Sequence, residues 1–307
     1  MPVKVAQEWF AICGGCEVTI LDVGEPLLDL LPALEFVHMP VLMDHKLYGQ
    51  TGEKSQPEIP EADVGIITGG IRNEENKLLA EEMRRKVNTL IAMGSCACFG
   101  GIPALGNQYV VDDIYNRVYR GTPTTDASDT PKDGVPALTD RVYALDEVIK
   151  VDLKLPGCPT TSELFATAVT SLLGGKPIIL SEKSVCDECP TIRQKKAVST
   201  LRRPLESADG VGQSLNQVRC LMEQGFLCQG PATRGGCGGS DGTPRCIRAY
   251  MPCRGCFGPV REGANPMVDM MTALSSIGLD AKVIPDRAAT FNRFVGAGGR
   301  LKPLPKR

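Results

Sequence analysis

The run TLIAMGSCACFGG, residues 89–101, combines a buried strand with a cysteine-containing turn. Its first five residues are uncharged and mostly apolar, a pattern typical of a short strand that is covered on both faces of a sheet. The strand is expected to end at Gly94, because glycine accommodates the backbone of a tight turn. Cys96 follows two residues later. The stretch therefore predicts a buried strand that presents a thiol at its carboxyl end.

The same arrangement recurs on both sides of this run. Residues 3–12 are mostly apolar and lead into the motif CGGC at residues 13–16, and residues 151–155 alternate and lead into Cys158. The segment DVGIIT, residues 63–68, predicts one further short buried strand. Helical patterns separate these strands. We therefore expect an α/β fold with a flavodoxin-like, doubly wound parallel sheet.

Two helix starts are visible between these strands. Asn73 stands before Glu74 and Glu75, so it is expected to cap a helix whose first turn is acidic. Thr160 and Glu163 have the spacing of a capping box. Both helices directly follow a predicted strand, as a doubly wound sheet requires.

Four cysteines follow the carboxyl ends of these strands: Cys13, Cys16, Cys96 and Cys158. In open α/β sheets ligands bind at this edge, so residues far apart in sequence are expected to meet there. Four thiolates are what a 4Fe–4S cluster requires, and the neighbouring glycines allow close backbone approach to such a cluster. Two other interpretations of residues 94–101 are a simple strand-to-helix turn and a phosphate loop. No Walker lysine follows, which disfavours the phosphate loop.

The remainder of the chain, from about residue 181, has a different character. It is rich in glycine, proline and cysteine and shows little periodicity, so we expect a small hydrophobic core and folding around metal. We place a first domain at residues 1–180 and a Cys-rich domain at residues 181–307. The second domain contains eight of the thirteen cysteines: Cys186, Cys189, Cys220, Cys228, Cys237, Cys246, Cys253 and Cys256.

Composition limits both the possible partners of the protein and the possible chemistry of its thiols. The net charge of −2 and the pI near 5.9 provide no basic field for nucleic acid. No apolar run approaches the ~20 residues that span a bilayer, and no leader sequence is visible, so we expect a cytoplasmic protein. Disulfides are disfavoured in that compartment. Zinc is the stronger competitor, although the two C-x-x-C pairs at residues 186–189 and 253–256 lie farther apart than in a zinc ribbon.

The motifs around the cysteines resemble a known family. CGGC at residues 13–16, GSCA at residues 94–97 and PGCP at residues 156–159 are similar to the proximal-cluster motifs of nickel–iron hydrogenase small subunits. FLCQGP at residues 226–231 and PCRGC at residues 252–256 are similar to the region that binds that family's other two clusters. Within the family, the resemblance is strongest to the methyl-viologen-reducing enzymes of methanogenic archaea. Those enzymes do not use deazaflavin, and they partner with heterodisulfide reductase.

The resemblance assigns twelve cysteines to three sites, each holding one 4Fe–4S cluster. The proximal site would consist of Cys13, Cys16, Cys96 and Cys158. The distal site would consist of Cys186, Cys189, Cys220 and Cys228. The medial site would consist of Cys237, Cys246, Cys253 and Cys256. Many members have histidine where Cys186 stands, and many have a non-ligand where Cys246 stands. Additional thiolates make the ligand set more anionic, which favours lower reduction potentials.

The resemblance implies an oxidoreductase subunit that transfers electrons and has no catalytic residue of its own. Dihydrogen would be split on a nickel–iron large subunit, and the electrons would reach a low-potential acceptor through an iron–sulfur subunit linked to heterodisulfide reductase. Two alternatives remain. One is a non-redox scaffold subunit stabilised by zinc. The other is the cluster subunit of a complex-I-like dehydrogenase, against which the second cysteine block argues because that family carries one cluster.

Several residues receive plainer interpretations. Cys98 is the thirteenth cysteine, and we expect it to be a buried structural thiol. His38 and His45 are expected to pack or form hydrogen bonds, and Trp9 is expected to lie in the core. The run RQKK at residues 193–196 is interpreted as a solvated face that could also dock an acidic redox partner.

Overall fold

The computed structural model describes residues 1–49, 51–124, 126–203 and 205–305 and forms two compact units. The first unit comprises residues 1–166 together with the C-terminal segment from residue 294. The second comprises residues 167–293. Helix α6 (Ser162–Leu173) runs across the division between them. The domain boundary that the sequence places at residues 180 and 181 stays a prediction.

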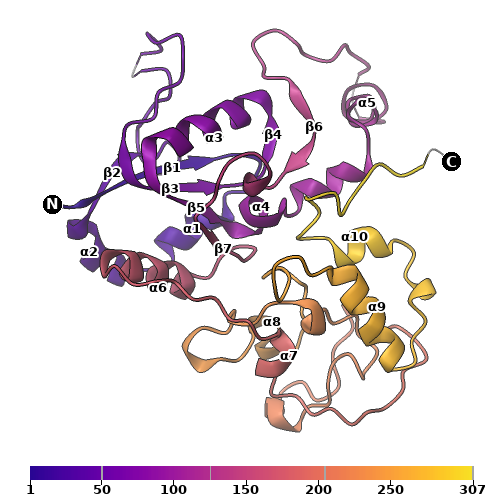
Figure 1. The fold of residues 1–307 in the computed structure, drawn as a ribbon. Helices are drawn as coiled ribbons and strands as arrows, with labels where there is room; N and C mark the ends of the chain where they lie inside the picture. Colours follow the sequence, from indigo (N-terminus) through magenta and orange to yellow (C-terminus); the bar gives the residue numbers. More distant parts are fainter. Residues whose placement is uncertain (50, 125, 204, 306–307) are drawn as a thin grey trace. The chain divides into compact units, whose positions relative to one another are not determined.

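A five-stranded parallel sheet forms the centre of the first unit (Figure 1). Its spatial order is β2-β1-β3-β5-β7, which is the order 2-1-3-4-5 when these five strands are counted along the chain. That order is the flavodoxin-like one, so the predicted doubly wound α/β fold is confirmed. The strands are β1 (Val3–Trp9), β2 (Leu34–His38), β3 (Ala62–Thr68), β5 (Val87–Met93) and β7 (Leu153–Leu155).

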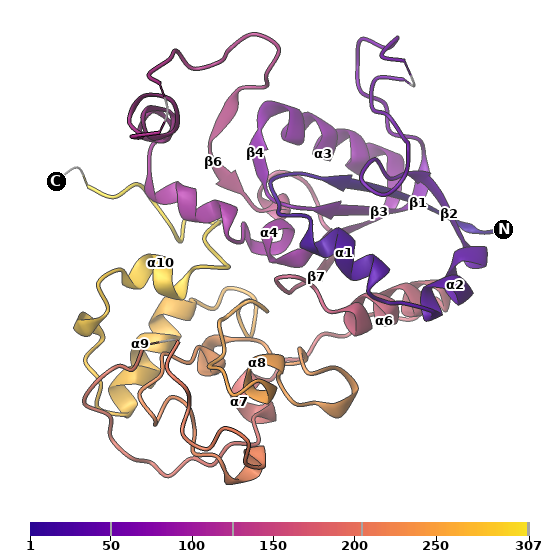
Figure 2. The same ribbon diagram turned by 180° about the vertical axis from the view of Figure 1, so that it is seen from behind.

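Helices cover both faces of this sheet. Figures 1 and 2 show α3 (Glu74–Lys86) on one face and α1 (Gly15–Leu21) on the other. The Asn73 side chain accepts a hydrogen bond of 2.7 Å from the Asn76 N–H, which confirms the predicted cap of α3. Burial of apolar side chains holds the layers together. Leu79 and Met83 of α3 are buried in one apolar cluster with strand residues that include Ile67 and Leu90.

Three details differ from the sequence-based expectation. Strand β1 ends at Trp9, three residues before the predicted end, and Trp9 is 46% exposed. The expectation that Trp9 lies in the core is therefore wrong.

The cap of α6 also differs from the prediction. The capping residue is Thr161, whose Oγ1 accepts from the Leu164 N–H at 3.2 Å. The hydroxyl of Thr160 donates instead to the Leu155 carbonyl at 3.0 Å.

The sequence did not reveal β2 or a second, antiparallel sheet. That sheet pairs β4 (Ile71–Asn73) with β6 (Leu138–Tyr143). The first unit also contains two shorter helices, α2 (Pro26–Leu30) and α5 (Val111–Tyr115), and α4 (Gly94–Phe99), which starts directly after β5. No helix among the described residues is both long and apolar enough to cross a membrane.

The second unit is mostly irregular but has a larger apolar core than its sequence suggests. Helix α9 (Pro266–Ser276) contributes Met270 and Leu274, which are fully buried against Phe291. Cys228 and Cys253 belong to the same buried cluster, so thiols complete this core. The unit's other helices are α7 (Val185–Glu188), α8 (Arg245–Arg248) and α10 (Arg287–Phe291).

Candidate iron–sulfur sites

The proximal cysteines all lie at the carboxyl edge of the parallel sheet. Cys13 follows β1, Cys16 lies in the first turn of α1, Cys96 lies in α4 directly after β5, and Cys158 follows β7. Because these strands are parallel, their carboxyl ends share one edge. Cys16 and Cys96 are buried, whereas Cys13 and Cys158 are exposed. The sequence therefore correctly predicted where on the sheet these four residues are.

The proximal thiols are close enough to influence one another. Burial, together with the nearby Glu17, Cys96 and Cys158, raises the pKa of Cys16 to about 12, against a lowering hydrogen bond from the Thr160 N–H. Burial likewise raises the pKa of Cys96 to about 12, with Cys158 and Cys13 adding to the shift. Four thiols crowded in this way resist ionising together. A metal cluster supplies the positive charge that makes four adjacent thiolates stable.

Glycine provides the space that a cluster needs beside these thiols. Gly94 has a φ of +86°, and a Cβ at that position would lie 2.3 Å from the Cys16 Sγ. A Cβ at Gly101 would lie 2.5 Å from the Cys96 Sγ. The Ser95 N–H donates to the Gly157 carbonyl at 2.7 Å, which ties the ends of β5 and β7 together. The residues at this edge thus fit a bulky inorganic group held by sulfur.

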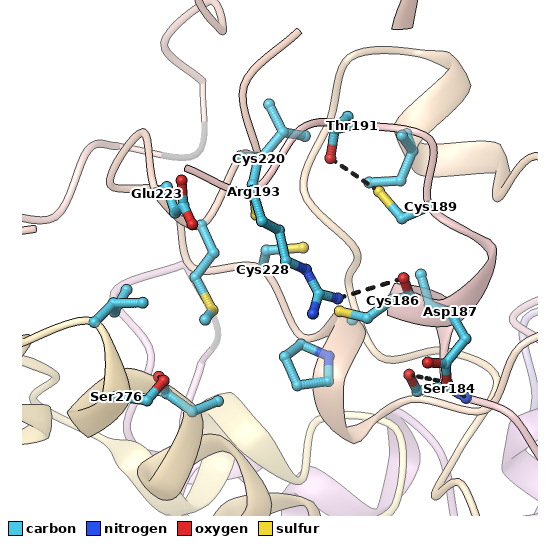
Figure 3. Close-up of a pocket in the computed structure, with 18 of the residues that line it drawn as sticks. Ser184, Cys186, Asp187, Cys189, Thr191, Arg193, Cys220, Glu223, Cys228 and Ser276 are labelled. Carbon is cyan, nitrogen blue, oxygen red and sulfur yellow. Dashed lines mark hydrogen bonds between the residues drawn. The ribbon is translucent and has the colours of Figure 1, made fainter. Parts of the chain in front are cut away.

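The distal cysteines line one cavity of the second unit (Figure 3). The cavity has a volume of about 570 Å³, and Cys186, Cys189, Cys220 and Cys228 all contribute to its wall. A Cβ at Gly230 would lie 3.0 Å from the Cys186 Sγ and 3.6 Å from the Cys228 Sγ, so these two sulfurs flank the same stretch of backbone. The Thr191 hydroxyl lies 3.1 Å from the Cys189 Sγ.

Electrostatic coupling connects the distal thiols. Burial raises the pKa of Cys186 to about 11, Arg193 opposes the shift, and Cys220 and Cys189 add to it. Burial raises the pKa of Cys228 to about 12, while the Gly230 N–H lowers it. Like Cys16 and Cys96, Cys186 and Cys228 therefore hold their protons near neutral pH without metal, and metal binding would release those protons.

The medial cysteines lie beside the distal ones. Burial raises the pKa of Cys237, with Cys246 adding to the shift, and Cys253 is coupled both to Cys246 and to Cys228 of the distal site. The Cys253 N–H donates to the Cys228 Sγ at 3.3 Å. One hydrogen bond thus joins a predicted medial cysteine to a predicted distal cysteine. Cys256 is partly exposed.

All thirteen cysteines lie in the described part of the chain as free thiols. Within residues 1–49, 51–124, 126–203 and 205–305, no three histidine, cysteine or acidic side chains gather closely enough to hold a single metal ion. The assignment of twelve cysteines to three clusters stays a prediction.

The plainer interpretations mostly agree with the structure. Cys98 is 1% exposed in the core of the first unit, and its Sγ donates to the Ala92 carbonyl at 3.2 Å. His38 is also buried, and its Nε2 lies 2.5 Å from Glu8 Oε1. His45 Nδ1 accepts from the Met39 N–H at 2.9 Å. The buried partner Glu8 was missed, since an acidic residue inside a strand gives no signal of what it will pair with.

Cys98→Ser is expected to keep the full iron content and the spectroscopic signal of the proximal site. Its thiol points into the apolar core, and burial raises its pKa far above the usual value, so it is unsuited to act as a thiolate ligand. Cys96→Ser is the matched control, because the two residues lie on the same helix, and it should lose that signal. Electron paramagnetic resonance measures both. The opposite pattern would show that Cys96 and Cys98 have been assigned the wrong way round.

Comparisons with known proteins agree with this arrangement. Residues 13–172 match the family model described as "NADH ubiquinone oxidoreductase, 20 Kd subunit". A subunit of the F420-non-reducing hydrogenase vhu of Methanocaldococcus jannaschii is 38% identical over 96% of this chain and 95% of its own length. The corresponding F420-non-reducing hydrogenase subunit of Methanothermobacter thermautotrophicus is 38% identical over 93% of this chain and 87% of its own length.

Two solved structures share the fold. A chain of the NAD⁺-reducing [NiFe]-hydrogenase in its H₂-reduced state is 31% identical, with a TM-score of 0.51 over 58% of this chain and 95% of that chain. A chain of the recombinant [NiFeSe] hydrogenase of Desulfovibrio vulgaris Hildenborough is 17% identical and supports the fold alone, with a TM-score of 0.55 over 86% of this chain and 95% of that chain.

The sheet, the cysteine-bearing edge and these similarities define an iron–sulfur oxidoreductase subunit, the small subunit of a nickel–iron hydrogenase. The chain belongs to the same family as the F420-non-reducing hydrogenase subunits of these two methanogens. The predicted resemblance is confirmed at this level. The family model shared with NADH dehydrogenases ends at residue 172, before the second cysteine block, whereas the hydrogenase relatives match more than nine-tenths of the chain.

Proposed function

We propose that this chain is the electron-transfer subunit of a cytoplasmic nickel–iron hydrogenase and holds three 4Fe–4S clusters between the dihydrogen-oxidising large subunit and a low-potential acceptor. The observation that carries the proposal is the grouping of eleven of the twelve assigned thiols into electrostatically coupled sets at the sheet edge and in the second unit. When bound, each cluster accepts and donates one electron at a time. The chain supplies the ligands, the hydrogen bonds and the exclusion of water.

Backbone donors stabilise the thiolates at each site. The Thr160 N–H donates to Cys16, the Gly230 N–H donates to Cys228, and the Gly255 N–H donates to Cys253. Such hydrogen bonds reduce the negative charge felt at sulfur and so help to set the reduction potential. The Cys253 N–H to Cys228 Sγ contact also gives electrons a short bonded route between the medial and distal ligand sets.

The proximal site has features suited to a protein partner. Cys13 is exposed, and α1, which follows it, leaves Val18 and Leu21 53% and 54% exposed at helical spacing on the same face. Burying these two apolar side chains against a partner would be favourable. We assign this surface to the large subunit, which would carry the dihydrogen-activating nickel–iron centre.

The acceptor is assigned from the relatives. They are F420-non-reducing hydrogenases of methanogens, so we propose an iron–sulfur acceptor subunit that passes electrons to heterodisulfide reductase. All-thiolate distal and medial sites favour the low potentials that such an acceptor needs. Neither nucleic acid nor a membrane enters this proposal.

Analysis of iron and acid-labile sulfide in the anaerobically purified complex tests the cluster assignment. With the large subunit's own iron subtracted, this chain is expected to carry about twelve irons and about twelve sulfides, because each 4Fe–4S cluster has four of each. Stoichiometric zinc, or a value near four irons, would contradict the proposal. The zinc-scaffold alternative predicts a colourless chain, whereas the cluster assignment predicts a brown one.

A further inference from the structure

Arg193 is a positively charged side chain that lines the distal cavity and contacts the backbone of a distal cysteine. Figure 3 shows its guanidinium pointing into the cavity toward Cys186, where Nη2 donates to the Cys186 carbonyl at 3.3 Å. Its charge favours the thiolate form of Cys186, acting against burial. The same cavity wall also contains Lys195, Asp187 and Glu223, so charges of both signs surround the site.

The backbone on both sides of Arg193 is fixed. Before it, the Ile192 N–H donates to the Val218 carbonyl at 2.8 Å, and the Ile192 carbonyl accepts from the Cys220 N–H at 2.7 Å. The second of these bonds ties the segment directly to a distal cysteine. Arg193 thus extends from backbone that is anchored next to one ligand and reaches toward another.

After Arg193, the carboxylate of Glu223 holds the chain in a strained turn. Glu223 is 6% exposed, and its two oxygens accept from the Gln194 N–H at 2.7 Å and the Lys195 N–H at 2.9 Å. Lys195 has a φ of +55°, in the left-handed region that non-glycine residues rarely adopt. Strained backbone is kept where the surrounding contacts enforce it, and it occurs often at functional sites.

We propose that Arg193 raises the reduction potential of the distal cluster and that Glu223 is the positioning residue that keeps Arg193 over the cavity. The inference rests on the proposed function, because it requires a cluster on Cys186, Cys189, Cys220 and Cys228. It explains why an acidic side chain is buried beside an anionic site: two backbone donors stabilise the Glu223 carboxylate, and the carboxylate fixes a cation in place.

The sign of the effect follows from charge. Reduction adds an electron to a cluster that four thiolates already make anionic, so a neighbouring cation stabilises the reduced form more than the oxidised form. Removing the guanidinium therefore makes reduction harder. We expect Arg193→Gln to decrease the equilibrium constant for reduction of the distal cluster about tenfold, which is about 59 mV for a one-electron couple.

The experiment is a redox titration of the intact hydrogenase complex, followed by electron paramagnetic resonance. Arg193→Lys keeps the charge and should retain most of the native potential. Arg193 and Lys196 are both exposed, but Lys196 is not part of the cavity wall. Lys196→Gln removes the same charge three residues later and should leave the potential unchanged, because that charge does not line the cavity. In a Glu223→Gln background, Arg193→Gln should shift the potential much less than in the native chain.

Each alternative outcome has a distinct meaning. An unchanged potential in Arg193→Gln, or an equal shift in Lys196→Gln, overturns the role of Arg193. An undiminished effect of Arg193→Gln in the Glu223→Gln background overturns the positioning role of Glu223. Cys186→Ser separates these results from failure of the proposed function itself. If it leaves every cluster signal intact, Cys186 is not a cluster ligand, and the inference fails with its premise.

Discussion

Gly94→Ala is expected to remove the proximal cluster, lowering the iron content of the chain from about twelve to about eight. Gly94 has a φ of +86°, which costs any other residue roughly 1–2 kcal/mol. The larger effect is steric, because the new Cβ would lie 2.3 Å from the Cys16 Sγ. Cys16 is 5% exposed, so its side chain cannot move aside into solvent without rearranging its neighbours. Iron analysis and the proximal resonance signal measure the loss.

Gly14→Ala is the matched control for this experiment. Gly14 has nearly the same φ, +88°, and lies between two proximal cysteines, but a Cβ there meets nothing within 4 Å. The two variants therefore share the backbone strain and differ in the collision with sulfur. Gly14→Ala should keep its proximal cluster. Equal losses in both variants would assign the effect to strain, and full iron in Gly94→Ala would remove Cys16 from the ligand set.

The sequence predicted the features that are set by local pattern. The strands leading to Cys13 and Cys96 are mostly apolar, the strand leading to Cys158 alternates, and their common edge follows from the rule for parallel sheets. The cap at Asn73 was also predicted, because capping depends on a few adjacent residues. The cap of α6 was displaced by one residue, since two successive threonines offer the same chemistry.

The features that were missed depend on contacts between distant segments. Strand β2 is a short edge strand between two prolines, and its pattern is too weak to predict it without its partner β1. Strands β4 and β6 pair across more than sixty residues of intervening chain. Glu223 shows the same limitation at the distal site, because nothing in the sequence relates it to the backbone of Gln194 and Lys195.

Glu8 of β1 and His38 of β2 form a buried pair, and the second large prediction concerns this pair. Each side chain is 2% exposed, and Glu8 Oε1 lies 2.5 Å from His38 Nε2. The other oxygen of Glu8 accepts from the Trp9 N–H at 3.3 Å. The His38 and His45 rings stack with centroids 6.3 Å apart. The pair thus joins β1 to β2 by a side-chain contact in addition to the backbone ladder.

His38→Leu is expected to destabilise the attachment of β2 by about 3–5 kcal/mol, because it leaves the Glu8 carboxylate buried without its partner. The double variant Glu8→Met with His38→Leu should recover most of that loss, since two apolar side chains can replace a buried polar pair at little cost. Lys54→Ala breaks an exposed pair with Glu58 and serves as the control, which should leave the opening of β1 and β2 unchanged. Hydrogen exchange of the β1 and β2 amides in the intact complex measures the local opening free energy. If the double variant opens as readily as His38→Leu, the cost comes from lost packing around His38, and the buried carboxylate is not its cause.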